Sequence, residues 1–433
     1  MEPAFHRIKT SGPIQATLTL PGSKSYTHRA LVAAALAAGE SLLSNALKAE
    51  DTELTAQALA RLGAGIAWQD SGVLIQGTGG RWLPVPEPIY LGNSGTSMRF
   101  LTALVALGQG EYRLTGTERL CQRPLGELLT ALAQLGVRAA SERGDGCPPV
   151  IIQGGLTGGR ASLSGAVSSQ YVSALLFIGP LAPDGLDLEV TGELVSRPYV
   201  DLTLKVMGGF GISYYREGYR FFQVPGGQAY LPQDCEIEAD ASSASYFWAA
   251  AAITGGRVTI TNLRPDSCQG DAAFPLILER LGCRVESSPA GLTVAGGPLG
   301  GIQVDMAAMP DLVPTLAVVA AFAQGDTVIT GVAHLRHKES DRLAAVATEL
   351  GKMGVAVRET ADGLVISGGQ PQGAAIDTYG DHRLAMSFAV AGLKAPGTVI
   401  RDPEVVAKSF PDFWQFFDRL YAVGIENERR LPG

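Results

Sequence analysis

A glycine recurs along this chain at intervals of close to 70 residues and ends a helix-like pattern each time. The glycines are Gly63, Gly136, Gly209, Gly282, Gly354 and Gly424, and successive ones stand 73, 73, 73, 72 and 70 residues apart. Glycine is favoured just beyond a helix C-terminus because it adopts left-handed backbone angles without steric cost. Repetition at so regular a period indicates one structural unit used six times.

The residues between these glycines predict what the unit contains. β-rich runs follow the glycines and flank pairs suited to hairpin turns, such as Ala290-Gly291 and Asp362-Gly363. A second, interleaved series of short turns precedes apolar helices, at Gly22, Gly92, Ala166, Asp240, Asp311 and Gly380. The unit is therefore helix, strand, helix, strand, strand, which predicts an α/β fold.

A chain of 433 residues exceeds what one hydrophobic core usually supports, so we expect two lobes of three units each. The sixth unit has its helix, residues 412–423, but no hairpin after it, and residues 5–20 predict two strands without a helix before them. We expect this N-terminal hairpin to complete the sixth unit. Lobe 1 then spans residues 21–227, lobe 2 spans residues 1–20 and 239–433, and residues 228–238 form the hinge. An open solenoid is the alternative, but its terminal units would not complement each other in this way.

Charge and composition narrow the function classes. A net charge of −8 disfavours nucleic acid and anionic membranes as partners. Apolar runs such as residues 312–323 are shorter than the ~18 residues that span a bilayer, and the N-terminus lacks a signal-like pattern, so we expect a cytoplasmic protein, with a monomer as the default. Five scattered cysteines without a C-x-x-C pair predict neither a disulfide framework nor a zinc site. His334 and His337 have no third ligand nearby in sequence, so we expect no metal and no cofactor.

Ionic residues gather at the predicted helix N-termini. The segment Pro21–Arg29 combines a glycine, capping serines and two cations ahead of an apolar helix, which is typical of an anion-binding turn. It is not a Walker loop, because Ser23 separates Gly22 from Lys24. Later turns carry Asn93 to Arg99, Arg123, Ser168-Ser169-Gln170, Arg197-Pro198-Tyr199, Lys338 to Arg342, Asp381-His382-Arg383 and Lys408. Each is compatible with a solvated cap, but their recurrence predicts one cleft that binds at least two phosphates or carboxylates.

Two carboxylates among these cations suggest more than binding. Asp311 and Glu339 lie where an ionised carboxylate could move protons, and an anion-binding protein without catalysis would need neither. The simpler interpretation of Asp311 is a helix N-cap before residues 312–323. The two interpretations are compatible.

Ten motifs, in order, resemble the 5-enolpyruvylshikimate-3-phosphate synthase family. They are LPGSKSYTHRAL, LGNSGTSMRFL, QRPLGELL, AVSSQYVSALL, SRPYVDLTL, ADASSASYF, MPDLVPTLAV, RHKESDRLAA, YGDHRLAM and VAKSFPDF. The resemblance runs from about residue 5 to about residue 420. It implies a two-lobed, inside-out, barrel-like α/β fold and transfer of the enolpyruvyl group of phosphoenolpyruvate to shikimate 3-phosphate, in the shikimate pathway of aromatic amino acid biosynthesis.

The resemblance also implies roles for the matching residues. Shikimate 3-phosphate is expected at Ser25, Arg29, Ser168, Ser169, Gln170, Arg197, Tyr199, Asp311, His334 and Lys338. Phosphoenolpyruvate is expected at Lys24, Asn93, Gly95, Arg123, Gln170, Arg342, Arg383 and Lys408. Glu339 is expected to move a proton at carbon 3, and Asp311 with Lys24 to handle the hydroxyl proton. Because like charges of the two lobes repel until an anion lies between them, we expect substrate to close the lobes.

Three positions depart from the family pattern: Tyr26-Thr27-His28 before Arg29, Phe100 where proline is common, and His334 where asparagine is frequent. They leave open the response to the inhibitor glyphosate, whose binding depends on the turn that contains Gly95. The sister family that acts on UDP-N-acetylglucosamine uses a reactive cysteine several residues before the matching arginine, whereas Cys121 lies only two before Arg123. A non-catalytic anion-binding protein of the same fold is the other alternative.

Overall fold

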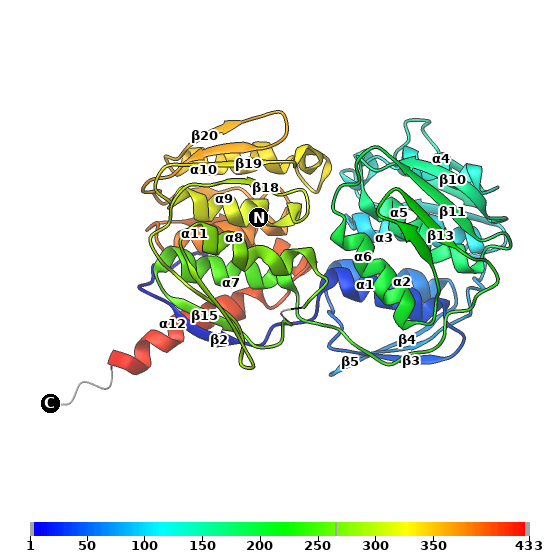
Figure 1. The fold of residues 1–433 in the computed structure, drawn as a ribbon, viewed down its shortest axis with the longest axis horizontal. Coiled ribbons are helices and arrows are strands. Elements are labelled where there is room, and N and C mark those ends of the chain that lie inside the picture. Colours follow the sequence, from blue (N-terminus) through cyan, green and yellow to red (C-terminus); the bar gives the residue numbers. More distant parts are fainter. Residues whose placement is uncertain (1–3, 265, 429–433) are drawn as a thin grey trace. The chain divides into compact units, whose positions relative to one another are not determined.

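The computed structural model describes residues 4–264 and 266–428, with side chains through residue 421. The chain forms two compact units (Figure 1). One is Gly22–Ile237, and the other joins the chain up to Pro21 with the part from Glu238 onward. The hinge role of residues 228–238 stays a prediction.

Three helix pairs and three sheets build the unit Gly22–Ile237. The helices are α1 (Lys24–Leu36), α2 (Glu50–Arg61), α3 (Gly95–Leu104), α4 (Gly126–Gln134), α5 (Ser169–Ile178) and α6 (Pro198–Gly209). The strands are β3 (Glu40–Ser44), β4 (Gly65–Gln69), β5 (Gly72–Gln76), β6 (Ile89–Tyr90), β7 (Glu111–Thr115), β8 (Arg138–Ser141), β9 (Val150–Gln153), β10 (Gly159–Ser164), β11 (Leu186–Thr191), β12 (Tyr215–Glu217), β13 (Phe221–Val224) and β14 (Cys235–Glu236).

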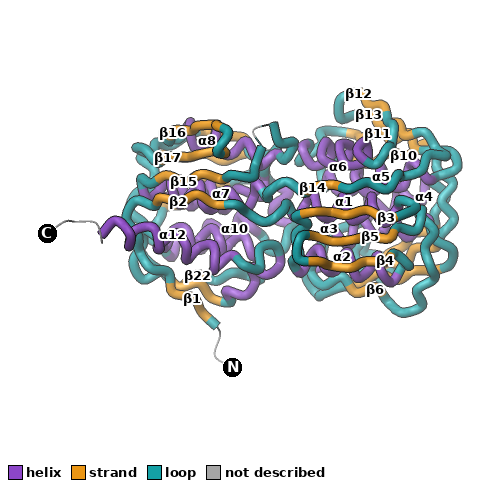
Figure 2. Tube along the Cα trace, turned by 90° about the horizontal axis from the view of Figure 1, so that it is seen from below, coloured by secondary structure: helices purple, strands orange, loops and turns teal. Residues whose placement is uncertain are grey.

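The three sheets share one topology. Their strand orders are β14-β3-β5-β4, β6-β7-β9-β8 and β10-β11-β13-β12. In each, the first pair is parallel and the two others are antiparallel, so each sheet contains one parallel strand more than the predicted strand and hairpin. Figure 2 shows the first of these sheets, with β14, β3, β5 and β4 side by side.

The other unit repeats the plan. Its helices are α7 (Ala241–Thr254), α8 (Phe274–Arg280), α9 (Val313–Ala321), α10 (Arg342–Lys352), α11 (His382–Gly392) and α12 (Phe413–Glu428). Its strands are β1 (Phe5–Arg7), β2 (Gln15–Leu18), β15 (Arg257–Ile260), β16 (Arg284–Ser288), β17 (Gly291–Ala295), β18 (Gln303–Asp305), β19 (Asp326–Thr330), β20 (Ala356–Glu359), β21 (Leu364–Ser367), β22 (Ala375–Ile376) and β23 (Val399–Arg401). The sheets are β2-β15-β17-β16, β18-β19-β21-β20 and the three-stranded β22-β23-β1. The predicted α/β fold of repeated units is confirmed.

The predicted N-terminal hairpin is wrong, because β1 and β2 lie in different sheets. β1 pairs antiparallel with β23 in the sixth sheet, as expected, but β2 pairs parallel with β15 in the fourth. β2 is followed by α1 and β14 by α7, and each of the two strands pairs in parallel with a strand of its own compact unit. Because β14 fills the place beside β3, β2 pairs with β15 instead. Each unit is thus closed by the strand that precedes the chain's passage to the other, which covers a sheet edge that would otherwise be open.

Four of the six glycines behave as predicted. Gly63, Gly136, Gly282 and Gly354 have φ of 110°, 86°, 114° and 79°, just beyond helix ends. Gly209 instead is the last residue of α6, and the left-handed residue is Gly211, with φ of 84°. Gly424 lies inside α12, which continues to Glu428 and is followed by no strand in the described chain.

Helices, not sheets, make up the centre of each unit. Every residue of α9 and α11 is buried, as is the alanine-rich stretch Ala30–Ala37 at the end of α1. A helix that is apolar all round is stable only when surrounded by protein. The strands keep an outer face, as the alternating exposure of β4 shows. This arrangement is the inside-out fold, and it leaves the helix N-termini as the polar ends of the core.

Candidate active site

Serine caps the central helices of the unit Gly22–Ile237. The hydroxyls of Ser23, Ser94 and Ser168 accept hydrogen bonds from the backbone N–H groups of Tyr26, Ser97 and Gln170. In the other unit three helices, α7, α10 and α11, have aspartate as N-cap: Asp240, Asp341 and Asp381 accept from the backbone N–H groups of Ser243, Ala344 and Arg383. A neutral cap leaves the positive end of the helix dipole uncompensated. The three serine-capped ends are therefore suited to anions.

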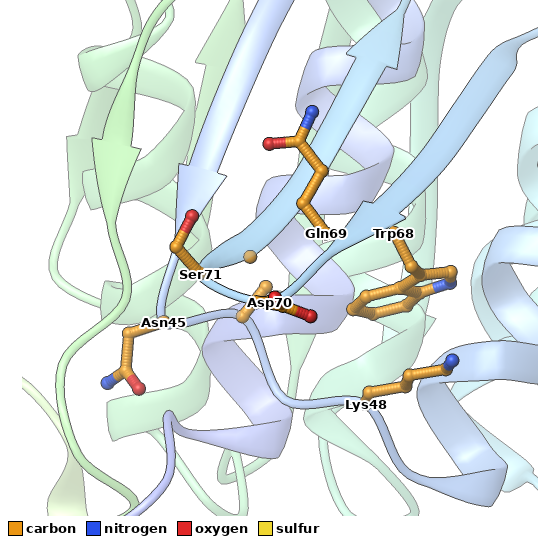
Figure 3. A pocket seen from close by; sticks show the side chains of 8 residues that line it. Asn45, Lys48, Trp68, Gln69, Asp70 and Ser71 are labelled. Atoms are coloured by element: carbon orange, nitrogen blue, oxygen red, sulfur yellow. The ribbon is translucent and has the colours of Figure 1, made fainter.

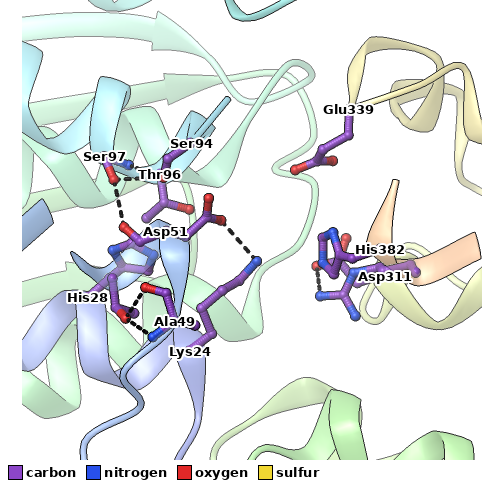
Figure 4. A network of polar contacts seen from close by, with 12 residues as sticks. Lys24, His28, Ala49, Asp51, Ser94, Thr96, Ser97, Asp311, Glu339 and His382 are labelled. Atoms are coloured by element: carbon purple, nitrogen blue, oxygen red, sulfur yellow. Dashed lines mark hydrogen bonds and ion pairs between the residues drawn. The ribbon is translucent and has the colours of Figure 1, made fainter. Parts of the chain in front are cut away.

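Lys24 is fixed by a carboxylate that the sequence did not single out. Its Nζ lies 3.2 Å from Oδ2 of Asp51, a buried residue in the first turn of α2 (Figure 4). The acidic opening of that helix, Glu50 to Glu53, was the only signal. Since an ion pair restricts a flexible lysine side chain to one orientation, Asp51 orients the Lys24 ammonium group.

Arg29 is buried between two aromatic rings. Its guanidinium carbon lies 5.3 Å from the ring centre of Phe100 and 5.7 Å from that of Tyr199. Its Nε donates to Thr203 Oγ1 and its Nη1 to the Ser25 carbonyl, both at 2.8 Å. The structure thus brings together Ser25, Arg29 and Tyr199, and it gives the unusual Phe100 a role as a cation–π partner of Arg29.

The turn at Gly95 faces two arginines. A Cβ atom on Gly95 would lie 2.6 Å from a guanidinium nitrogen of Arg123 and of Arg99. Arg99 Nη1 also donates to Oε1 of Gln170 at 2.8 Å, and Gln170 Nε2 donates to Thr96 Oγ1 at 2.9 Å. Arg99 and Thr96 were missed, although both stand in the turn between Asn93 and Arg99. Only glycine leaves room for both guanidinium groups here.

One residue of the predicted set, Arg197, contacts residues outside that set. Arg197 pairs with Glu193 at 3.0 Å and its guanidinium carbon lies 5.3 Å from the Tyr219 ring centre. Both partners lie outside the predicted set. Asn93 and Ser169 do lie beside the caps of α3 and α5, as their positions before Ser94 and after Ser168 require.

In the other unit, Asp311 is the centre of a cluster of ion pairs. Its Oδ1 lies 2.9 Å from Arg342 Nη1 and 3.7 Å from Lys338 Nζ, and its Oδ2 lies 2.7 Å from Arg383 Nη2. Arg342 further binds Glu339 at 2.9 Å and the buried Asp381 at 2.7 Å. Five predicted residues therefore meet in one cluster: Asp311, Lys338, Glu339, Arg342 and Arg383.

The helix-cap interpretation of Asp311 is wrong. Asp311 lies in the short 3-10 helix Pro310–Leu312, and α9 begins after it with Leu312 as an N-cap that makes no side-chain hydrogen bond. Its carboxylate is committed to the cations instead. Two further members of the predicted set lie in 3-10 helices of this unit. Lys408 is buried at the end of Pro403–Lys408, and His334 is half-buried in Ala333–His337.

The cations control the charge of this cluster. Burial alone would raise the pKa of Asp311, but Arg383, Lys338 and Arg342 together hold it well below its usual range, so the carboxylate is ionised. Burial opposes the charge of Arg342, yet Asp381, Glu339 and Asp311 raise its pKa above the usual value. Burial, with Lys338, lowers the pKa of His334 to about 4, so this imidazole is neutral at physiological pH.

Another buried carboxyl group, that of Asp271, faces the same cluster. Asp271, in the 3-10 helix Gly270–Ala273, accepts a hydrogen bond from Ser242 Oγ. Burial, to which the charge of Asp311 adds, raises the pKa of Asp271 to about 7, although Arg383 acts in the opposite direction. Asp271 was not among the predicted site residues, because no local sequence pattern shows that an aspartate will be buried.

Replacing Asp271 with asparagine should stabilise the protein increasingly as pH rises. The folded chain keeps a proton on Asp271 up to about pH 7, whereas the unfolded chain loses it near pH ~4, so the wild type loses stability on this account between these values. We expect the melting temperature of Asp271→Asn, minus that of the wild type, to rise between about pH 5 and about pH 8. Thermal melts of both proteins measure this. A difference that does not change with pH would contradict the assignment; His334 is common to both proteins and cancels.

A cavity of about 490 Å³ at the β4–β5 turn is lined by residues outside the predicted set, among them Asn45, Trp68 and Asp70 (Figure 3).

Among residues 4–264 and 266–428, no three His, Cys, Asp or Glu side chains gather as a metal-binding group. Within the same ranges, no helix has both the length and the hydropathy that crossing a membrane requires.

Comparison with known proteins shows the family to which the chain belongs. The family model described as EPSP synthase (3-phosphoshikimate 1-carboxyvinyltransferase) matches residues 8–417. Proteins named 3-phosphoshikimate 1-carboxyvinyltransferase are similar: that of Syntrophobacter fumaroxidans is 49% identical over 95% of this chain and 99% of its own, and that of Methanoculleus marisnigri is 45% identical over 97% and 99%. A solved structure of EPSP synthase from Acinetobacter baumannii superposes with a TM-score of 0.78, at 32% identity, and covers 96% of this chain and 98% of its own. The chain belongs to the EPSP synthase family.

Proposed function

We propose that this chain transfers the enolpyruvyl group of phosphoenolpyruvate to the 5-hydroxyl of shikimate 3-phosphate and releases inorganic phosphate, a step of aromatic amino acid biosynthesis. The observation that carries the proposal is the cluster of Asp311 with Arg342, Arg383 and Lys338, to which Glu339 is joined through Arg342. Cations bind the anionic reactants, and the two carboxylates supply sites for proton transfer. Membership of the family supports the same reaction.

The serine-capped helix ends of the unit Gly22–Ile237 supply the proposed phosphate contacts. Ser25 and Arg29 on α1, with Ser168 and Ser169 on α5, would bind the phosphate of shikimate 3-phosphate. Gln170 and Tyr199 would contact the ring. The hydrogen bonds from Arg99 and to Thr96 orient the Gln170 amide, so that its second N–H remains as a donor. Arg197, His334 and Lys338 remain proposed ring contacts.

Phosphoenolpyruvate would bind to Lys24, Arg123, Arg342, Arg383 and Lys408, beside Asn93 and Gly95. The 5-hydroxyl oxygen forms a bond with carbon 2 while carbon 3 takes a proton, which gives a tetrahedral adduct. This adduct loses a proton from carbon 3 as the bond between carbon 2 and the phosphate oxygen breaks. Glu339 would give and take the proton at carbon 3, and Asp311 with Lys24 would handle the hydroxyl proton, with the ionised carboxylate of Asp311 as its acceptor. We further propose that the enzyme acts in the cytoplasm as a monomer.

An assay of phosphate release tests the proposal. We expect inorganic phosphate to appear only when phosphoenolpyruvate and shikimate 3-phosphate are both present, together with a product whose mass is that of shikimate 3-phosphate plus the enolpyruvyl group. Release from phosphoenolpyruvate alone would indicate a phosphatase, and no release with both substrates would indicate a binding protein.

Thiol alkylation should leave the activity unchanged. Cys121 is buried in the 3-10 helix Leu120–Gln122, and its Sγ lies 3.6 Å from the carbonyl oxygen of Gly116. A transferase of the UDP-N-acetylglucosamine type would depend on a reactive cysteine near this position. We expect iodoacetamide to leave more than about half of the turnover. Inactivation that either substrate prevents would contradict the proposal.

A further inference from the structure

The turn that leads to Arg383 has an uncommon backbone conformation. Asp381 N donates to the carbonyl of Thr378 at 2.8 Å, and the two residues between them, Tyr379 and Gly380, have φ of 53° and 67°. Left-handed angles at both central positions of a turn favour asparagine and glycine. A tyrosine there is uncommon, because its Cβ crowds the backbone. Such a residue persists only where its surroundings hold it.

A buried carboxylate holds Tyr379. The tyrosine is 47% exposed, yet its hydroxyl donates to Glu349 Oε1 at 2.7 Å, and Glu349 has no exposed surface. Lys352 Nζ donates to both carboxylate oxygens of Glu349, at 2.8 and 2.9 Å, and Asp377 N donates to Oε2 at 3.1 Å. A buried carboxylate is stable only when it is paired and hydrogen-bonded in this way. Burial, with the charge of Glu349, raises the pKa of Tyr379 to about 12, so the hydroxyl remains a donor.

Helix α10 therefore holds this segment at two points. Glu349 lies seven residues after Arg342, which places both side chains on one face, two helical turns apart. Glu349 binds Tyr379 and Asp377, and Arg342 binds the carboxylate of Asp381 through Nε at 2.7 Å. Asp381 in turn accepts from the backbone N–H of Arg383 at 3.0 Å.

We propose that Glu349 and Tyr379 are positioning residues for the transferase reaction. Through the turn Thr378–Asp381 they set where α11 begins, and so fix the Arg383 guanidinium that pairs with Asp311. Asparagine or glycine would satisfy the backbone of this turn better than tyrosine does. The advantage of tyrosine at position 379 is therefore its hydroxyl group, which through the turn fixes the position of Arg383. The readout rests on the proposed function, since Arg383 is a proposed ligand of phosphoenolpyruvate.

Two substitutions separate the effect of the Tyr379 hydroxyl from the effect of the backbone conformation. Tyr379→Phe keeps the ring and removes the hydroxyl. Tyr379→Asn also removes the hydroxyl but suits the left-handed angle, and Lys352 and the Asp377 N–H still bind Glu349, so this variant should fold about as well as the wild type. We expect both to raise the KM for phosphoenolpyruvate about tenfold, the effect of losing one hydrogen bond to a charged group, with a smaller change in kcat. Tyr215→Phe is the matched control, because it removes an exposed tyrosine–glutamate hydrogen bond of 3.2 Å to Glu217. Its KM should not change.

The experiment measures kcat, KM for phosphoenolpyruvate and melting temperature for the wild type and the three variants. A raised KM in Tyr379→Asn with an undiminished melting temperature supports the inference, since a merely structural role would not give it. Unchanged KM in both variants, or a defect in Tyr379→Phe that is absent in Tyr379→Asn, overturns it. If the wild type itself releases no phosphate with both substrates, the proposed function has failed instead.

Discussion

Asp311→Asn is expected to lower kcat by about 10²–10⁴-fold, the usual contribution of a positioned acid or base, without raising the KM for phosphoenolpyruvate. The reason lies in the ion pairs of this carboxylate. It neutralises part of the charge of Arg342, Arg383 and Lys338, so its removal makes the surroundings more positive and favours an anion. The amide cannot accept the proton of the attacking hydroxyl.

Steady-state kinetics with each substrate varied in turn measures this split. Asp266→Asn is a matched control, because Asp266 forms an exposed ion pair with Arg264 at 3.0 Å. A kcat within about threefold of the wild type would exclude Asp311 from proton transfer. A large rise in KM with unchanged kcat would make it a residue that only binds substrate.

Glu339→Gln is expected to lower kcat to a similar extent, about 10²–10⁴-fold, for a different reason. Glutamine can still accept the hydrogen bond that Arg342 donates to Oε2 at 2.9 Å, so the geometry of the cluster is largely kept. It cannot give a proton to carbon 3 or take one from it. In D₂O we therefore expect the wild type to place deuterium at carbon 3 of the product, and the variant to do so far more slowly.

Turnover and deuterium incorporation, followed by proton NMR, distinguish this role from others. Glu359→Gln is the control, since Glu359 pairs with Arg336 at 2.8 Å and belongs to no proposed substrate contact. If Glu339→Gln lowers turnover but incorporates deuterium at the wild-type rate per turnover, another group moves the proton at carbon 3.

The repeat could be predicted because its signals are local. A glycine marks the same position in each of the six sequence repeats, and four of these six glycines have the expected left-handed φ beyond a helix end. The pairing of β2 with β15 could not be predicted, because it joins residues about 240 apart and depends on which other strand already fills the place beside β3. Strand order depends on which of several segments pairs best at each sheet edge, so it cannot be predicted from the sequence of one segment alone.

The candidate site divides in the same way. Residues in helix-opening turns, such as Ser25, Arg342 and Arg383, could be found because such turns are recognisable from caps and charges. Their partners could not. Asp51 and Asp271 come from other elements, and only packing shows that the first orients Lys24 and that the second is buried beside Arg383.

The fate of one oxygen atom tests the central claim most directly. In phosphoenolpyruvate this oxygen joins carbon 2 to phosphorus, and phosphoenolpyruvate labelled there with ¹⁸O can be turned over by the wild type with shikimate 3-phosphate. If the adduct at carbon 2 expels phosphate, the carbon–oxygen bond breaks and the label leaves in the inorganic phosphate, as mass spectrometry would show. Unlabelled phosphate, with the ¹⁸O retained in a pyruvate or enolpyruvyl product, would mean that the phosphorus–oxygen bond breaks and would contradict the account.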